Sequence, residues 1–251
     1  MLETNMPYLQ STPVEFTPYL YVAELFESYD DTVFFIKDLE GRYIACNDTL
    51  LTRTNCKTRS ELLGRKPSEL LGLTLGGSYE DQDQRVMMQG RAIKELLEVH
   101  IYMNLSTGWC LTTKFPLKHN DGTVFGIMGI SKDLKPAAMN SEEFEQISPA
   151  IEYVTNNLDT PPSLARLARI VGLTPYQLDR RVQKVFGLTA GQWILKQRLD
   201  SAQHQLSEMD DSIASIALNI GYADQSAFSR QFRKTIGVSP FVYRQLKRQS
   251  R

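Results

Sequence analysis

A segment near the end of the chain combines side chains that can bind a polyanion with apolar residues at helical spacing. In GYADQSAFSRQFRKTIGVSP, residues 221–240, Phe228 and Phe232 recur at the helical interval. The rest of its surface is polar or basic: Gln225, Ser226, Ser229, Arg230, Arg233 and Lys234. Guanidinium and amide groups can read base edges, and basic groups can neutralise phosphates. Taken alone, the segment is also typical of a solvated surface helix.

A second copy of this pattern lies upstream. SLARLARIVGLTPYQLDRRVQKVFGLTAGQW begins at Ser163, and SIASIALNIGYADQSAFSRQFRKTIGVSPFVY begins at Ser212. The offset between the copies is 49 residues before the shared glycine and 50 after it, so that Arg180 corresponds to Arg230. Each copy predicts a short helix with a serine N-cap, a glycine turn and a second capped helix. This is the order of a helix-turn-helix, whose second helix enters the DNA major groove.

The segment between the copies predicts one long connecting helix. AGQWILKQRLDSAQHQL, residues 190–206, has no internal proline and carries apolar residues on a mostly helical rhythm. Such a helix would fix the two helix-turn-helix units, residues 163–186 and 212–236, relative to one another. If both units enter successive major grooves on one face of a duplex, their centres must lie about 34 Å apart.

Charge is distributed unevenly along the chain of 251 residues, whose net charge is −1. Residues 1–146 carry 14 Lys and Arg against 21 Asp and Glu, a net charge of −7, whereas residues 147–251 carry 14 against 8, a net charge of +6. A basic C-terminal half suits contact with phosphates. Length and charge together indicate two domains, although each half could simply have a solvated surface of one sign.

The last hundred or so residues resemble the AraC/XylS-type DNA-binding domain. The resemblance is carried by the two helix-turn-helix units, by Arg198, Ala202 and Leu206 in the connecting helix, and by GYADQSAFSRQFRKTIGVSPFVYR. It implies an all-α domain and a sequence-specific transcription regulator. The implied partners are double-stranded DNA and RNA polymerase, with activation as the family's usual outcome.

The resemblance also implies roles for the polar positions of the second helices. The implied base contacts are Tyr176, Asp179, Arg180, Gln225, Ser226 and Arg230, and the implied phosphate contacts are Gln183, Lys184, Arg233 and Lys234. Two residues depart from the family pattern, because Val182 replaces a bulky aromatic and Asp179 places an acid near the base-facing surface. A carboxylate there can accept from cytosine N4 but repels phosphate, so we expect the second unit to dominate affinity.

The N-terminal half predicts an α+β domain with one five-stranded antiparallel sheet. TVFFIKD and RYIACN are strand-like runs joined by LEG, helical or loop segments follow over residues 48–91, and KELLEVHIYMNL, GWCLTTKFPLKHN and TVFGIMGISKDL are longer strands. This order is similar to a PAS domain over residues 19–134, which implies a sensor or dimerisation module. We therefore expect a PAS-like domain at 1–135, a linker at 136–147 and the DNA-binding domain at 148–251.

Strand alternation suggests which side chains would face a ligand cavity in such a domain: Phe34, Ile36, Cys46, Trp109, Leu111 and Thr113. These six could hold a small molecule, with Trp109 and Thr113 shaping the cavity, or could equally be plain core. His100 shares its parity with Glu98, which predicts an outward position. The histidines and cysteines are scattered, so we expect no metal and no cofactor, and either an organic effector or no ligand at all.

Other function classes lack their signatures. No apolar run approaches the roughly 18 to 20 residues of a membrane span, and MLETNMPYLQ lacks the layout of a secretion signal, which predicts a cytoplasmic protein. No nucleophile with a base, carboxylate pair or phosphate loop is recognisable, so we expect no enzyme. A helix predicted to begin at Pro18, with Thr17 as its N-cap, could pack on the sheet or form a homodimer. The alternative function is a constitutive DNA-binding regulator whose PAS-like domain only mediates dimerisation or recruits partners.

Overall fold

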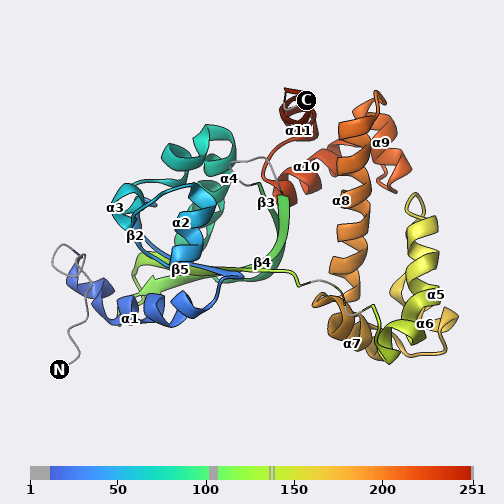
Figure 1. The fold of residues 1–251 in the computed structure, drawn as a ribbon, viewed down its shortest axis with the longest axis horizontal. Helices are drawn as coiled ribbons and strands as arrows, with labels where there is room; N and C mark the ends of the chain where they lie inside the picture. The colour runs from blue at the N-terminus through green and yellow to red at the C-terminus, as the bar shows by residue number, and fades with distance from the viewer. Residues whose placement is uncertain (1–11, 102–106, 136, 138, 250–251) are drawn as a thin grey trace. The chain divides into compact units, whose positions relative to one another are not determined.

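The computed structural model of the chain describes residues 12–101, 107–135, 137 and 139–249 (Figure 1). The chain divides into two compact units, Met1–Asp133 and Leu134–Arg251. The first helix of the second unit, α5 (Glu142–Asn156), begins inside the stretch 136–147 that the sequence suggested as a linker. Its N-cap is Ser141, whose hydroxyl accepts from the Phe144 backbone N–H at 3.2 Å.

The first unit is built on a five-stranded antiparallel sheet in the order β2-β1-β5-β4-β3. The strands are β1 (Thr32–Asp38), β2 (Tyr43–Cys46), β3 (Ile93–Ile101), β4 (Thr107–Lys118) and β5 (Val124–Asp133). The predicted α+β class with five strands is confirmed. Residues 102–105 of the third predicted strand lie outside the described residues.

Helices cover both faces of this sheet (Figure 1). One face carries α2 (Asp48–Thr54), α3 (Arg59–Leu62) and α4 (Pro67–Gln89), and the other carries η1 (Val14–Phe16), α1 (Thr17–Leu25) and η2 (Phe26–Ser28). Helix α1 begins at Thr17, one residue earlier than predicted, because Phe16 occupies the N-cap position. With both faces covered, β1 is buried at every position from Thr32 to Lys37.

A buried asparagine joins β1, the end of β2 and the start of α2. Asn47 is 0% exposed and caps α2. Its Oδ1 accepts from Phe34 N at 2.9 Å and from Leu50 N at 3.4 Å, while its Nδ2 donates to Thr32 O at 2.7 Å and Phe26 O at 3.1 Å. An aspartate could not donate to the two carbonyls, so the amide is the side chain that this junction requires.

In its described part, the second unit is helical throughout. After α5 come α6 (Leu164–Ile170), α7 (Pro175–Phe186), α8 (Ala190–Glu208), α9 (Ile213–Asn219), α10 (Gln225–Ile236) and α11 (Pro240–Gln249). The predicted N-caps are confirmed, since Ser163, Thr174, Ser212 and Asp224 each accept from a backbone N–H three residues ahead. The turn glycines, Gly172 and Gly221, have the positive φ angles that such a turn requires, 66° and 77° respectively.

The connecting helix α8 links the two helix-turn-helix pairs. Figure 1 shows α7 near one end of α8 and α9 and α10 near the other. Leu199, Ala202 and Leu206 are each 0% exposed on its buried side. Arg198 ties α8 to the second turn, because its Nε donates to Ile220 O at 2.6 Å and its guanidinium lies 4.0 Å from the centre of the Tyr222 ring. The second helix pair is thereby held against the connector.

Candidate DNA-binding surface and buried cavity

Helix α10 is anchored by aromatic residues on one side. Asp224 Oδ1 caps it by accepting from Ala227 N at 2.7 Å. Phe228 and Phe232 are both 0% exposed, with ring centres 5.4 Å apart, and Phe232 packs on Tyr243 at 5.5 Å. The helix is therefore held on one side, and its opposite side is available for contact with a partner.

The opposite side of α10 carries the residues that the sequence singled out. Gln225, Ser226, Arg230, Arg233 and Lys234 are all exposed. Within the described part of the chain, none of these five side chains makes a hydrogen bond or an ion pair. They form a polar and basic surface whose donors are all available to a ligand such as DNA.

Helix α7 presents the matching surface of the first helix-turn-helix unit, but some of its basic side chains are already engaged in contacts within the protein. Tyr176 is 74% exposed, and Arg180 Nη1 donates to Gln183 Oε1 at 3.3 Å. Lys184 forms an ion pair with Glu143, in the acidic first turn of α5. The hydrogen bond from Lys184 holds the pKa of the Glu143 carboxyl below its ordinary value. Any phosphate contact from Lys184 must compete with this carboxylate.

Asp179 has a role in the fold that the sequence did not reveal. Its side chain is half-buried, and Oδ1 accepts from the backbone N–H of Ala190 at 2.7 Å, the first residue of α8. The position that corresponds to Ala190 in the second copy is Pro240, which has no N–H to satisfy. The Asp179 carboxylate therefore stabilises the start of the connecting helix α8, and we do not include Asp179 among the base contacts that we propose.

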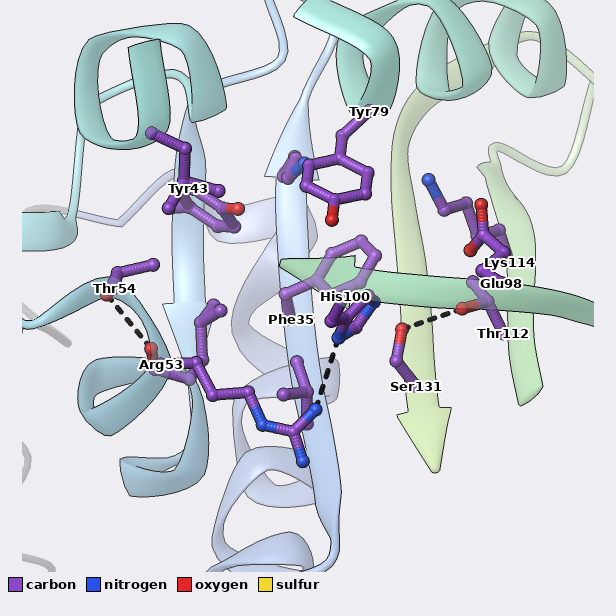
Figure 2. Close-up of a pocket in the computed structure, with 14 residues that line it drawn as sticks. Phe35, Tyr43, Arg53, Thr54, Tyr79, Glu98, His100, Thr112, Lys114 and Ser131 are labelled. Atoms are coloured by element: carbon purple, nitrogen blue, oxygen red, sulfur yellow. Dashed lines mark hydrogen bonds between the residues drawn. The ribbon is translucent and has the colours of Figure 1, made fainter. Parts of the chain in front are cut away.

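A cavity lies in the first unit between the sheet and helices α2 and α4 (Figure 2). Its volume is about 60 Å³, whereas one water molecule needs about 10 to 15 Å³ by this kind of measure. Apolar and aromatic walls are interrupted by polar and charged groups: Val33, Phe35, Lys37, Tyr43, Leu50, Arg53, Thr54, Leu71, Tyr79, Glu98, His100, Thr112, Lys114 and Ser131. This combination is typical of a site for a small polar ligand.

A buried carboxylate bridges two buried lysines at this cavity. Asp83 is 1% exposed, and its two oxygens accept from Lys37 Nζ at 2.5 Å and Lys114 Nζ at 2.6 Å. Burial alone would raise the pKa of Asp83, but the two ammonium groups hold it below its ordinary value. Lys37 also lies over the rings of Phe35 and Tyr43, 4.8 and 4.5 Å from their centres. Lys37 is therefore held in place by the carboxylate and by two rings.

His100 and Arg53 form a second polar group. Burial, and then the nearby Arg53 guanidinium, lower the pKa of His100 to about 3, so the ring is neutral near pH 7. Arg53 Nη1 lies 3.2 Å from His100 Nδ1, and Arg53 Nη2 pairs with Asp133 at 2.6 Å. Figure 2 marks the contact between Arg53 and His100 with a dashed line. The ring of Tyr79 meets that of His100 edge-on. The predicted outward position of His100 and Glu98 is wrong, because both line the cavity.

The six residues predicted to face a cavity do not line it: Phe34, Ile36, Cys46, Trp109, Leu111 and Thr113. Phe34 and Ile36 pack against Leu20 and Ala23 of α1, on the other face of the sheet. Cys46 is buried beside the cavity without reaching it, and the three residues of β4 alternate with the lining residues Thr112 and Lys114. The predicted set therefore mixed the two faces, since Cys46 lies on the cavity side while Phe34 and Ile36 lie on the other. Because both faces of the sheet are covered, alternation could not tell which one holds the cavity.

Comparisons with known proteins agree with this architecture. A model described as a helix-turn-helix domain matches residues 167–246, and one described as a PAS fold matches residues 26–138. The HTH-type transcriptional activator AarP of Providencia stuartii is 30% identical over 98 residues, a match that covers 39% of this chain and 73% of AarP. The chain belongs to the AraC family of transcriptional regulators. Its first unit carries a PAS fold, as the sequence predicted.

Other matches to this AraC-family regulator also fall on the second unit. The regulatory protein PocR of Salmonella typhimurium is 38% identical over 96 residues, which cover 38% of this chain and 32% of PocR, so the chain spans about a third of that relative. A solved AraC-type transcriptional regulator from Chromobacterium violaceum covers 42% of this chain and 94% of its own, with 26% identity and a TM-score of 0.40. Among the described residues, no helix is long and apolar enough to span a membrane.

Proposed function

We propose that this AraC-family regulator grips a specific DNA site with α7 and α10 and activates transcription by contacting RNA polymerase. A small ligand in the cavity of the PAS-fold unit, or the geometry of a homodimer, controls how the DNA-binding unit is presented. The cavity, with its charged and aromatic lining, favours ligand control over the constitutive alternative.

The observation that carries the DNA-binding part is the duplicated set of basic residues on two helices joined by α8. Arg180 and Lys184 on α7 correspond to Arg230 and Lys234 on α10. With 19 residues, α8 is about 28 Å long at 1.5 Å per residue. This length is comparable to the spacing of about 34 Å between successive major grooves on one face of DNA.

The proposed contacts divide into two kinds. We assign base contacts to exposed residues of the recognition helices: Tyr176, Arg180, Gln225, Ser226 and Arg230. We assign phosphate contacts to residues at the helix flanks: Gln183, Lys184, Arg233 and Lys234. Base contacts carry sequence specificity, whereas phosphate contacts carry affinity that falls as salt rises.

The two kinds of contact predict different behaviour in one experiment. Arg230→Ala should cost about 1 to 3 kcal/mol of binding free energy on the specific site and relax the preference for one base pair. Lys234→Ala should weaken binding to all sequences alike and lower the slope of log affinity against log salt by about one. Fluorescence anisotropy with specific and scrambled duplexes at several salt concentrations measures both. The same loss on both duplexes for both variants would contradict the assignment.

A further inference from the structure

The charged groups at the cavity of the first unit are balanced, and this restricts what the cavity can bind. Three cations line it, Lys37, Arg53 and Lys114, together with one carboxylate, Glu98. The carboxylates of Asp83 and Asp133 do not line the cavity, but they pair with these cations and complete the balance. His100 adds no charge near pH 7. An ion entering this site would lose its hydration and would find no net opposite charge to compensate for that loss, which is unfavourable. The site therefore suits an uncharged ligand.

Two buried carboxylate oxygens of this set have no donor among the described residues, Asp133 Oδ1 and Glu98 Oε2, and of these two residues Glu98 is the one that lines the cavity. Glu98 is 2% exposed, and its Oε1 accepts from Gln82 Nε2. Its Oε2 is also buried, and it meets no hydrogen-bond donor among the described residues. An ionised carboxylate oxygen can only accept, and a buried acceptor without a partner is unfavourable. The site therefore favours a ligand that donates an N–H or O–H to Glu98.

Donors and aromatic rings border the same space. Lys114 Nζ directs one N–H to Asp83 and has two more to offer. Because arginine can only donate, His100 Nδ1 is the acceptor of the Arg53 contact, which leaves N–H on Nε2 of the neutral ring. The rings of Phe35, Tyr43 and Tyr79 complete the lining (Figure 2). A ligand that also accepts a hydrogen bond, and that is flat, satisfies these groups.

We propose that the cavity binds a flat, uncharged molecule of about one ring, which donates a hydrogen bond to Glu98 Oε2 and accepts one from Lys114 or His100. The proposal rests on the proposed function, since it names the ligand class for the cavity of the PAS-fold unit. The cavity volume of about 60 Å³, several times what one water needs, sets the size.

Four single-ring probes of matched shape test this ligand class on the full-length protein. Benzamide is neutral and carries both donor and acceptor, acetophenone replaces the NH₂ by CH₃, benzoate is an anion and benzamidinium is a cation. In calorimetric titration, benzamide should bind most tightly and the other three at least about tenfold more weakly, because each lacks a hydrogen bond to a charged group or adds a charge. Benzamide alone should also raise the melting temperature, by mass action.

Two variants test whether Glu98 accepts the hydrogen bond from the ligand. Glu98→Gln turns an N–H donor toward the cavity, so the preference for benzamide over acetophenone should shrink to about one. Glu24→Gln, on exposed α1 across the sheet, is the matched control and should keep the wild-type preference. If Glu98→Gln does not fold, the four-probe series on the wild-type protein still decides.

The outcomes separate this proposal from the proposed function. Equal binding of benzoate or of acetophenone, or no binding by any of the four probes, would overturn the ligand class. DNA binding by the same preparation, measured in parallel, is independent of these results. If benzoate binds and alters DNA affinity, ligand control stands and the neutral ligand class is wrong.

Discussion

The two helix-turn-helix units share one backbone pattern but hold their recognition helices with different side chains. In the second unit, Phe232 packs between Phe228 and Tyr243, with ring centres 5.4 and 5.5 Å away. In the first unit, Val182 fills the position of Phe232 and is 2% exposed. Aromatic packing there comes from Phe186, whose ring lies 5.4 Å from Trp193. The duplication has kept the caps and the glycine turns while the interiors have diverged.

The polar surfaces have diverged as well. On α7, Lys184 is paired with Glu143, and Asp179 serves the start of α8. On α10, the side chains of Arg230, Arg233 and Lys234 have no such partners among the described residues. From this difference we expect the second helix-turn-helix unit to supply most of the affinity for DNA, because the first helix-turn-helix unit must exchange internal contacts for contacts with DNA.

The largest expected difference lies in the interiors. Phe232→Ala should destabilise the second helix-turn-helix unit by about 3 to 5 kcal/mol, because it removes a buried ring at the centre of an aromatic row. Val182→Ala removes two methyl groups and should destabilise the first helix-turn-helix unit by about 2 kcal/mol. Hydrogen exchange followed by mass spectrometry on the full-length protein reports each unit through its own peptides. Equal loss of protection in the two variants would contradict the proposed difference in packing.

The next largest difference is the loss of DNA affinity expected from two corresponding arginines, Arg180 of α7 and Arg230 of α10. Arg230→Ala should cost about 1 to 3 kcal/mol of specific binding free energy. Arg180→Ala should cost less, because Arg180 already donates to Gln183 and lies on the helix that faces the acidic turn of α5. Anisotropy titrations of both variants against one specific duplex make the comparison. A greater loss from Arg180→Ala would reverse the assigned ranking of the units.

Asp179 and its counterpart Ser229 sharpen the comparison in the range of about 1 kcal/mol. Asp179→Ala removes the acceptor for the Ala190 N–H and should destabilise the first unit by about 0.5 to 2 kcal/mol, as loss of a helix cap does. Ser229→Ala, beside a proline that needs no acceptor, should stay within about 0.5 kcal/mol of wild type. Urea unfolding measures both. Base preference should be unchanged in Asp179→Ala, and a change confined to one base pair would restore Asp179 to the base-contact set.

The fold of the C-terminal unit, Leu134–Arg251, could be predicted in detail from the sequence because the sequence patterns that specify it are local. Serine, threonine and aspartate caps, turn glycines and helical periodicity act within a few residues, and the internal repeat tested each signal twice. The role of Asp179 was missed because it depends on a contact with Ala190, in another helix. Even so, the absence of an N–H at Pro240 was visible in the repeat and could have indicated that role.

The cavity was predicted less well because its position depends on long-range packing. Five strands could be recognised from runs and turns, but alternation gives two faces and does not say which one the helices leave partly open. A usable signal was present: Lys37, Glu98, His100 and Lys114 place polar groups at one parity on three strands. Of these, His100 and Glu98 were predicted to face outward, whereas both line the cavity. Asp83 on α4 pairs with Lys37 and Lys114, and Arg53 on α2 contacts His100.

The smallest expected effect is also the most direct test of whether the contact between Glu143 and Lys184 limits DNA binding by the first helix-turn-helix unit. Glu143→Gln removes the carboxylate that pairs with Lys184, so the lysine becomes available to phosphate. Lys184 is exposed and Glu143 is partly exposed, hence the gain in affinity should be modest, with a salt slope steeper by at most about 0.9. Because Lys184 lowers the pKa of Glu143, acidification should reproduce this gain only below the ordinary range of a glutamate. Glu152→Gln removes the same charge from an exposed position of α5 and is the matched control; an equal gain from both variants would indicate a general charge effect and no specific restraint of α7.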